Sequence, residues 1–215
     1  MIWTKGMPMN DHEDMVRRKA AFLARAERYS SLGFDRFAAA EFVIGAGGRL
    51  SGPALDIGTG KGLTALARQA LEVVSVDTDA NEQALAFFLA AEAGLEDHVR
   101  FVCADAAVLS FPGEFFGCAA LVDILHHVRD PAPVLQETAR VLKPSGILIL
   151  ADFSREGFKL VARVDREEGR EHPVIGITLE SAAAWLSEKG FEVSVRLGGH
   201  HHDVIVLTKK TGEGG

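Results

Sequence analysis

The stretch Ala54-Leu-Asp-Ile-Gly-Thr-Gly-Lys-Gly62 predicts a short buried strand that runs into a glycine-rich turn. Its three alternating glycines leave one edge of the turn without side chains, so the backbone can adopt positive φ and approach a ligand closely. Good helix formers occupy residues 63–70, and the free N–H groups at the start of such a helix favour a carboxylate or a phosphate. The layout favours a nucleoside cofactor, and the alternative is a tight turn that binds nothing.

Two other glycine loops fail on spacing. A dinucleotide-binding fingerprint needs a third glycine at the position that Leu63 occupies. A phosphate-binding loop needs a glycine where Leu55 stands, and a serine or threonine where Gly62 stands. Neither motif therefore describes this turn.

The composition indicates one soluble domain with a small or uncharged substrate. The chain has 215 residues, 47% of them apolar and 25% charged, and a net charge of −7. No run of lysines or arginines marks a nucleic-acid-binding surface, so no nucleic-acid partner is expected. Cys103 and Cys118 lie in apolar runs, which favours buried free thiols in a reducing cytoplasm. The sequence contains neither a secretory signal nor the ~18 apolar residues of a membrane span, so we expect no membrane partner.

The order of elements indicates a parallel sheet covered on both faces. Residues 1–50 are expected to form an N-terminal helical lid, residues 51–210 the core, and residues 211–215 a flexible tail. The first ten or so residues are also expected to be mobile. The expected strands cover 54–57, 73–77, 100–104, 118–122, 147–151, 191–196 and 203–208, and the expected helices 15–29, 34–44, 61–70, 80–93, 131–142, 155–171 and 179–189. Only a few residues join the last two strands, which must therefore run antiparallel.

Acidic residues mark the ends of five successive strands that precede this hairpin. They are Asp56, Asp77, Asp105, Asp123 and Asp152. In an open α/β sheet the ligand binds beyond the carboxyl ends of the parallel strands. One such acid is as readily a helix cap, but five together favour a ligand site. Asp77 follows Gly58 by 19 residues, where its two oxygens can accept both hydroxyls of a ribose.

From about residue 52 to 153 the chain resembles the class I S-adenosylmethionine-dependent methyltransferases, especially the small-molecule group called type 11. The segments that carry the resemblance are Leu55-Asp-Ile-Gly-Thr-Gly-Lys-Gly62, Val76-Asp77, Ala104-Asp105-Ala106, Leu125-His-His127 and Val141-Leu-Lys-Pro-Ser-Gly146. The resemblance implies an α/β fold, a Rossmann-like three-layer sandwich. Its seven-stranded, mostly parallel sheet would have the order 3-2-1-4-5-7-6, with the last strand antiparallel.

The resemblance also implies how S-adenosylmethionine would be bound. Asp56 and Gly58 would hold its methionine part, and Gly60 would allow close approach. Asp77 would accept the ribose hydroxyls. The other cofactor contacts implied are Asp105 and Ala106 at the adenine, the backbone of Val122 beneath the sulfonium, and Thr59, Thr78 and His127.

The reaction implied is in-line transfer of the methyl group to an oxygen, nitrogen or sulfur atom of a small molecule, with S-adenosylhomocysteine as product. Bringing the two reactants together in the right orientation supplies about 7–11 kcal/mol of barrier reduction. The sequence Val122-Asp-Ile-Leu-His-His127 lacks the Asn/Asp-Pro-Pro-Tyr signature of enzymes that methylate exocyclic or amide nitrogens. We expect a monomer or homodimer. The alternatives are a regulatory module that binds the cofactor without turnover, an aminopropyl transferase, and an NAD-type oxidoreductase.

The topology that the resemblance implies would bring six of the eight histidines to the carboxyl edge of the sheet. His126 and His127 follow the fourth strand, residues 200–202 form the last turn, and His172 lies between 153 and 178. An acceptor hydroxyl or thiol must lose a proton, and a histidine is the natural base, so His126, His127, His200 and His201 are the predicted catalytic residues. The alternatives are a solvated turn or a divalent metal, and we predict no metal because the spacing is not typical of ligands.

Residues 153–178 occupy the place where the family builds its acceptor pocket. Arg170 and His172 are predicted to recognise a carboxylate or a phosphate on the acceptor. The family's N-terminal helices often close over the cofactor, which makes Tyr29 a predicted substrate contact together with Arg25. A charged helix that faces the solvent is the alternative explanation for the insertion.

Overall fold

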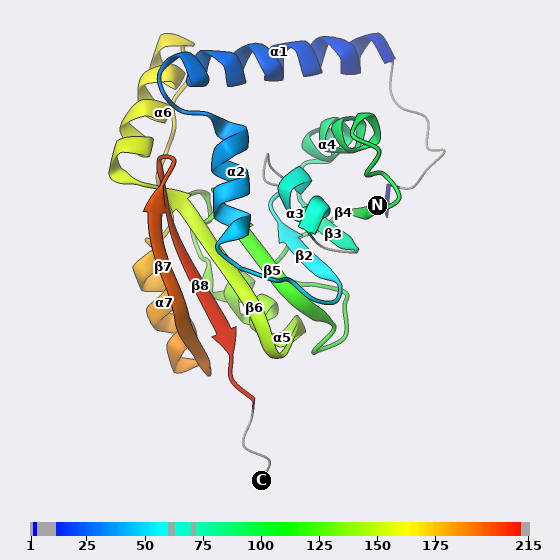
Figure 1. Cartoon of the computed structure of the whole chain (residues 1–215), viewed down its shortest axis with the longest axis vertical. Coiled ribbons are helices and arrows are strands. Elements are labelled where there is room, and N and C mark those ends of the chain that lie inside the picture. The colour runs from blue at the N-terminus through cyan, green and yellow to red at the C-terminus, as the bar shows by residue number, and fades with distance from the viewer. Residues whose placement is uncertain (1, 4–11, 60–62, 70–71, 212–215) are drawn as a thin grey trace.

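A computed structural model describes residues 2–3, 12–59, 63–69 and 72–211 (Figure 1). The strands are β1 (Ile2–Trp3), β2 (Ala54–Ile57), β3 (Val73–Asp77), β4 (Val99–Cys103), β5 (Phe116–Val122), β6 (Leu142–Phe153), β7 (Phe191–Gly199) and β8 (His202–Lys209). The helices are α1 (His12–Ser31), α2 (Arg36–Gly45), α3 (Leu63–Gln69), α4 (Ala80–Glu92), α5 (Ala132–Val141), α6 (Arg155–Glu167), α7 (Leu179–Glu188) and the 3-10 helix η1 (Leu125–His127). The predicted alternation of strands and helices is confirmed.

The strands form one sheet in the order β1-β4-β3-β2-β5-β6-β8-β7. Strands β2 to β6 pair in parallel, whereas β8 runs antiparallel to both β6 and β7. Counted from β2, this is the predicted order 3-2-1-4-5-7-6 with the last strand antiparallel. The sheet also has an eighth strand that we did not predict, because we expected the first ten or so residues to be mobile. The two residues of this strand, β1, pair with β4.

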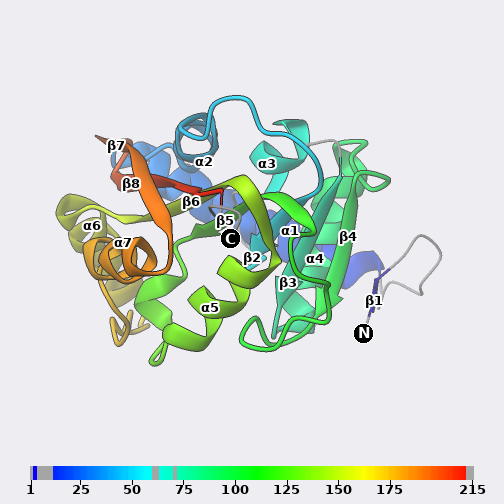
Figure 2. The ribbon, with the colours of Figure 1, turned by 90° about the horizontal axis from the view of Figure 1, so that it is seen from below.

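Helices cover both faces of the sheet, as the apolar strands require. On one face, Val73, Phe101 and Ile149 belong to a core cluster that includes buried residues of α2, α3 and α4. On the other face, Val74 and Leu121 pack in a cluster with buried residues of α5 and α7. Figure 2 shows α2 and α3 on one side of the strands and α5 and α7 on the other. The predicted three-layer sandwich is therefore confirmed.

Strand β6 begins five residues earlier than we predicted. Leu142 pairs with Phe116 directly after α5, and the ladder resumes only at Ile147, opposite Cys118. Residues 143–146 bulge between them; residues 143–145 are exposed, Gly146 is buried, and Ser145 has a φ of 61°. The segment that we interpreted as a helix stop therefore also forms a β-bulge.

The turn between β7 and β8 has two successive residues in the left-handed region, His200 at a φ of 50° and His201 at 64°. A two-residue hairpin turn needs positive φ at both positions, and asparagine or glycine is usual there. Each such residue costs on the order of 1 kcal/mol. Contacts elsewhere must therefore offset the strain.

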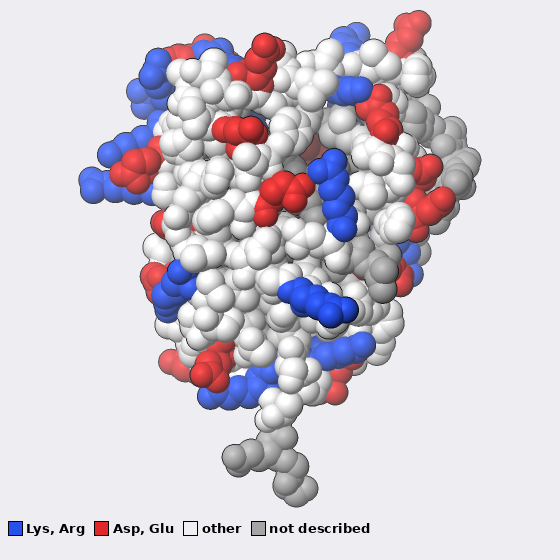
Figure 3. Space-filling view, in the orientation of Figure 1, with Lys and Arg blue, Asp and Glu red and all other residues white. Residues whose placement is uncertain are grey.

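No helix within the described residues is long and apolar enough to span a bilayer. On the face shown in Figure 3, acidic and basic side chains are interspersed rather than gathered in one patch of a single sign.

Gly117 gives a test of the packing at the start of β5. A Cβ added there would lie 1.8 Å from the backbone oxygen of Ser51, so the backbone itself would have to move. We expect Gly117→Ala to lower the free energy of unfolding in urea by about 2–3 kcal/mol. The control is Gly45→Ala at the end of α2, where no atom lies within 4 Å of the added Cβ, and it should raise stability by up to about 1 kcal/mol. Equal unfolding midpoints for the two variants would contradict the packing.

Candidate active site

A cavity of about 650 Å³ lies at the carboxyl ends of β2, β3 and β5. Figure 1 shows α1 running across this edge of the sheet, beside α6. The predicted site residues that line the cavity are Tyr29, Asp56, Gly58, Thr59, Asp77, Thr78, Val122, His126, His127, Arg170 and His172. The fold therefore brings most of the predicted residues to one place, although Gly60 lies outside the described residues.

Gly58 begins the loop after β2 in the left-handed region, with a φ of 84°. Its N–H donates to the backbone oxygen of Val76 on β3 at 2.9 Å. A Cβ at this position would lie 2.8 Å from the Cδ1 atom of Ile124. Both the turn and the close approach of Ile124 therefore favour glycine here.

The carboxylate of Asp77 joins two loops of the cavity. Its Oδ2 atom accepts the backbone N–H of Thr59 at 2.8 Å, and its Oδ1 atom accepts that of Asp79 at 2.8 Å. Each carboxylate oxygen has two lone pairs, so both oxygens retain acceptor capacity toward the hydroxyls of a ribose.

A chain of buried polar side chains lies beneath this loop. Gln83 Nε2 lies 3.4 Å from Thr59 Oγ1, which lies 2.7 Å from Ser75 Oγ, and Ser75 donates to Asp56 Oδ2 at 2.7 Å. The sequence analysis missed Ser75 and Gln83. The available signal was a serine inside the apolar run of β3, because a polar residue buried in a sheet requires partners.

Burial raises the pKa of Asp56 to about 7. The hydrogen bond from Ser75 opposes this shift, and the charge of Asp77 adds to it. Asp56 therefore exchanges its proton near neutral pH, and a cationic ligand beside it would favour the charged form.

The loop after β5 is held by a partly buried ion pair. Asp123, at a φ of 56°, lies with its Oδ1 atom 3.0 Å from Nε2 of His202, whose Nδ1 donates to the backbone oxygen of His200 at 3.0 Å. Both partners are acceptors, so both ring nitrogens carry protons. Burial lowers the pKa of His202, but the hydrogen bond and charge of Asp123 outweigh it, and the net shift is upward.

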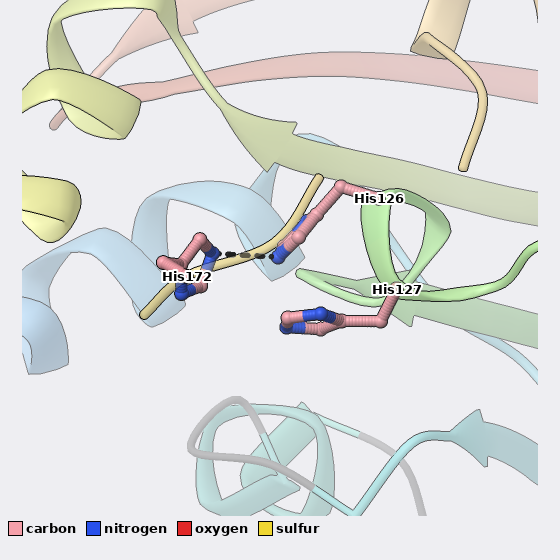
Figure 4. A group of neighbouring side chains, drawn as sticks. All are labelled: His126, His127 and His172. Atoms are coloured by element: carbon pink, nitrogen blue, oxygen red, sulfur yellow. Dashed lines mark hydrogen bonds between the residues drawn. The ribbon is translucent and has the colours of Figure 1, made fainter. Parts of the chain in front are cut away.

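Three imidazoles meet on the other side of the cavity (Figure 4). The Nδ1 atom of buried His126 lies 2.6 Å from Oδ1 of Asp152, and its Nε2 atom lies 3.1 Å from Nε2 of His172. The ring centroids of His126 and His127 are 3.9 Å apart. Burial, followed by the charge of His126, lowers the pKa of both His127 and His172, so both are neutral near pH 7.

His200 and His201 do not line the cavity, although we predicted them as catalytic residues. The ring of His200 lies 5.1 Å from that of Phe42, and the ring of His201 lies 5.0 Å from that of Phe34. His201 also donates from Nε2 to the backbone oxygen of Gly33 at 3.2 Å. The strained turn is thus packed against the connection between α1 and α2.

Asp165 pairs with several side chains in the part of the cavity wall that α1 and α6 form. It is 5% exposed and pairs with Arg25, with Arg170 at 3.1 Å and with Nδ1 of His172 at 3.2 Å. Arg25 also donates to the hydroxyl of Tyr29 at 3.2 Å. The guanidinium of Arg170 and the hydroxyl of Tyr29 are therefore already engaged by protein groups.

Asp105 and Ala106 are not among the residues that line the cavity. Asp105 is exposed, and its Oδ1 atom accepts the backbone N–H of Ala107 at 2.8 Å. Their predicted contact with the adenine remains a prediction.

Residues 55–150 match the family model described as "Methyltransferase domain". Over this segment the chain is similar to methyltransferases. It is 33% identical over 145 residues to the 27-O-demethylrifamycin SV methyltransferase of Amycolatopsis mediterranei (strain S699), covering 64% of this chain and 53% of that protein. It is 36% identical over 87 residues to the ubiquinone/menaquinone biosynthesis C-methyltransferase UbiE of Marinomonas sp. (strain MWYL1), covering 40% of this chain and 35% of that one.

The chain thus spans about half or less of the length of these two relatives. Among solved structures, the cyclase SpnF superposes with a TM-score of 0.65 at 20% identity, over 81% of each chain. At this identity the likeness establishes the fold and not the reaction.

The cavity suits S-adenosylmethionine, the cofactor that the resemblance implies, in its charge. Six carboxylates and three guanidiniums are among its described lining residues: Asp56, Asp77, Glu82, Asp123, Asp165 and Glu171 against Arg25, Arg36 and Arg170. An excess of carboxylates favours a ligand with a positive sulfonium and an ammonium group. The loop at Gly58 provides the bare backbone, and Asp77 the acceptors for a ribose.

Asp56→Asn tests the proton exchange at the base of the site. The pKa of Asp56 is raised from an ordinary value of 3.8, so its contribution to folding is complete below that value and is lost as pH rises through about 7. Asparagine does not titrate, so the variant does not lose stability in this way as the pH rises. The stability of the variant relative to the unsubstituted protein should therefore increase between about pH 5 and about pH 8, by at most roughly 1.4 kcal/mol per pH unit.

Urea unfolding at both ends of this pH range measures the difference in the free energy of unfolding between the variant and the unsubstituted protein. Asp130→Asn makes the same chemical change at an exposed position and serves as the control. If Asp56→Asn and the unsubstituted protein lose or gain stability in parallel over this range, the pKa of Asp56 is not raised.

Proposed function

We propose that this protein transfers the methyl group of S-adenosylmethionine to a small-molecule acceptor. The observation that carries the proposal is a single cavity with two chemically different halves. One half consists of the loop at Gly58 and the carboxylate of Asp77, and the other consists of three imidazoles. Such a cavity can hold an electrophile and a nucleophile side by side, which is the main requirement of the reaction.

In the cofactor half, Asp77 accepts the ribose hydroxyls, while Asp56, Gly58 and Thr59 bind the methionine part. Thr78 and Val122 flank these groups, and the predicted roles of Gly60, Asp105 and Ala106 complete the set. Bound there, S-adenosylmethionine supplies a methyl carbon attached to a positive sulfur. The excess of carboxylates around the cavity stabilises that charge before transfer.

In the acceptor half, neutral imidazoles can take a proton from an oxygen, nitrogen or sulfur atom. The acceptor atom then forms a bond to the methyl carbon, the carbon–sulfur bond breaks, and S-adenosylhomocysteine is the product. His126 and His127 face the cavity from η1, and His172 faces it from the segment after α6. The carboxylate of Asp152 fixes the orientation of His126.

Tyr29 and Arg170 form the roof of this half rather than free substrate contacts, because Arg25 and Asp165 hold them. With residues 1–50 and 153–178 they act as the lid and the acceptor pocket of the proposed enzyme. The cavity volume, shared by both reactants, limits the acceptor to a small molecule. We propose a cytoplasmic monomer or homodimer.

Asp77→Asn tests the cofactor half. The substitution removes the charge that receives the ribose, so we expect the Kd for S-adenosylmethionine to rise by about 10–100-fold, as for hydrogen bonds to a charged group. Calorimetry measures the affinity. The exposed Asp130→Asn should bind like the unsubstituted protein. Unchanged affinity in Asp77→Asn would remove the proposed cofactor site.

His127→Ala tests the acceptor half. It should lower the release of S-adenosylhomocysteine with a panel of hydroxyl, amine and thiol acceptors, and weaken binding of S-adenosylmethionine far less than Asp77→Asn does. The reason is that its ring packs against His126 and His172 in the acceptor half, although the resemblance also implies a cofactor contact for it. The matched control is His200→Ala, since His200 is exposed and lies outside the cavity. Affinity without any product from the unsubstituted protein would favour the binding module, and equal rates in both variants would remove His127 from the mechanism.

A further inference from the structure

Two imidazole nitrogens, Nε2 of His126 and Nε2 of His172, face each other in the acceptor half. Nδ1 of His126 lies 2.6 Å from the carboxylate of Asp152, and Nδ1 of His172 lies 3.2 Å from that of Asp165. Ionised carboxylates only accept hydrogen bonds, so each Nδ1 donates to its carboxylate. The two Nε2 atoms are thereby turned toward each other and lie 3.1 Å apart. In an imidazole that donates through Nδ1, Nε2 is the atom that can bind a metal ion.

The separation of these two nitrogens suits a metal ion. Two ligands at about 2.0–2.1 Å from a tetrahedral Zn²⁺ lie about 3.3 Å apart. His127 supplies a third nitrogen, and one ligand atom from each of the three histidines lies within 4.8 Å of the others. Figure 4 shows His126 and His127 reaching from η1 and His172 coming from the segment on the opposite side. Three ligands from two segments would leave a fourth position open to the cavity.

The surroundings of the histidines are those of a metal site. Metal-binding imidazoles almost always donate their other ring N–H to a carboxylate or a carbonyl, which fixes the tautomer and the ring orientation. Asp152 and Asp165 do this for His126 and His172. Asp152 is itself fixed, since its Oδ1 atom accepts the backbone N–H of Phe153 at 2.9 Å.

We propose that His126, His127 and His172 bind a divalent transition-metal ion, with one coordination position open to the acceptor. Three neutral imidazoles suit zinc and similar ions better than magnesium or calcium, which prefer oxygen ligands. The binding site goes beyond the proposed function. The role of the ion rests on that function and would replace proton transfer to the imidazoles, because their lone pairs would then bind the ion. A hydroxyl or thiol bound at the open position would lose its proton to water more readily, before it attacks the methyl carbon.

Zinc titration of the chelator-treated, full-length protein tests the site. Calorimetry should detect one tight Zn²⁺ per chain, and Co²⁺ should give the visible absorption of a tetrahedral complex. We expect His126→Gln and His172→Gln to lower the affinity at least about tenfold, and Asp165→Asn by about 10–100-fold through loss of its support to His172. The control is His200→Ala, which removes an exposed histidine outside the cavity and should bind like the unsubstituted protein.

Three outcomes would overturn the proposal: no Zn²⁺ bound at micromolar concentration, equal binding by His172→Gln and the unsubstituted protein, or equal loss in His200→Ala. If His126→Gln fails to fold by circular dichroism, the half-buried His172 decides the question. Metal binding is measured without S-adenosylmethionine, and cofactor binding can be measured on the metal-free protein. A failure of the metal site is therefore distinguishable from a failure of methyl transfer.

Discussion

Carboxylates at the ends of neighbouring parallel strands need hydrogen-bond donors, and this requirement determines how the loops at the carboxyl edge of the sheet are arranged. Asp77 accepts hydrogen bonds from two backbone amides in two loops. Asp56 accepts one from a hydroxyl on β3, and Asp152 accepts one from an imidazole of η1. A buried carboxylate without such partners would cost several kcal/mol. Two of these bonds, from Thr59 to Asp77 and from His126 to Asp152, join a loop to a strand other than the one that precedes it. These parts of the cavity wall are therefore positioned before any ligand arrives.

The alternation of strands and helices could be predicted, because it depends on local patterns, whereas the order of the strands in the sheet was implied by the resemblance to the methyltransferases. Continuous apolar strands, the glycine turn at 58 and the acid at 77 each follow from a few adjacent residues. The hairpin at the end followed from its short connection. The bulge at 143–146 could not be predicted in this way, since it arises from the pairing of Leu142 with Phe116, two residues far apart in the sequence.

The histidines illustrate what the sequence leaves open. His126 and His172 are 46 residues apart and meet only because η1 and the segment after α6 face the same cavity. His200 and His201 lie close to the sheet edge in the topology, yet their rings turn toward Phe42 and Phe34. Which way a side chain turns depends on neighbours from other elements, and no spacing rule contains that information.

Asp165 links the N-terminal helices to the chemistry. It pairs with Arg25 of α1 and with His172 at the same time. Displacement of α1 would leave a buried carboxylate short of a partner and would free the ring of His172 to rotate. The order of the acceptor half therefore depends on the docking of α1.

The turn between β7 and β8 connects segments that are remote in the sequence. His201 holds the connection between α1 and α2 through Gly33, while His202 holds the start of the loop after β5 through Asp123. Three segments that are remote in the sequence are thus fastened at one point, and two residues with unfavourable backbone angles sit at that point. Movement of any one of these segments would therefore be transmitted to the other two.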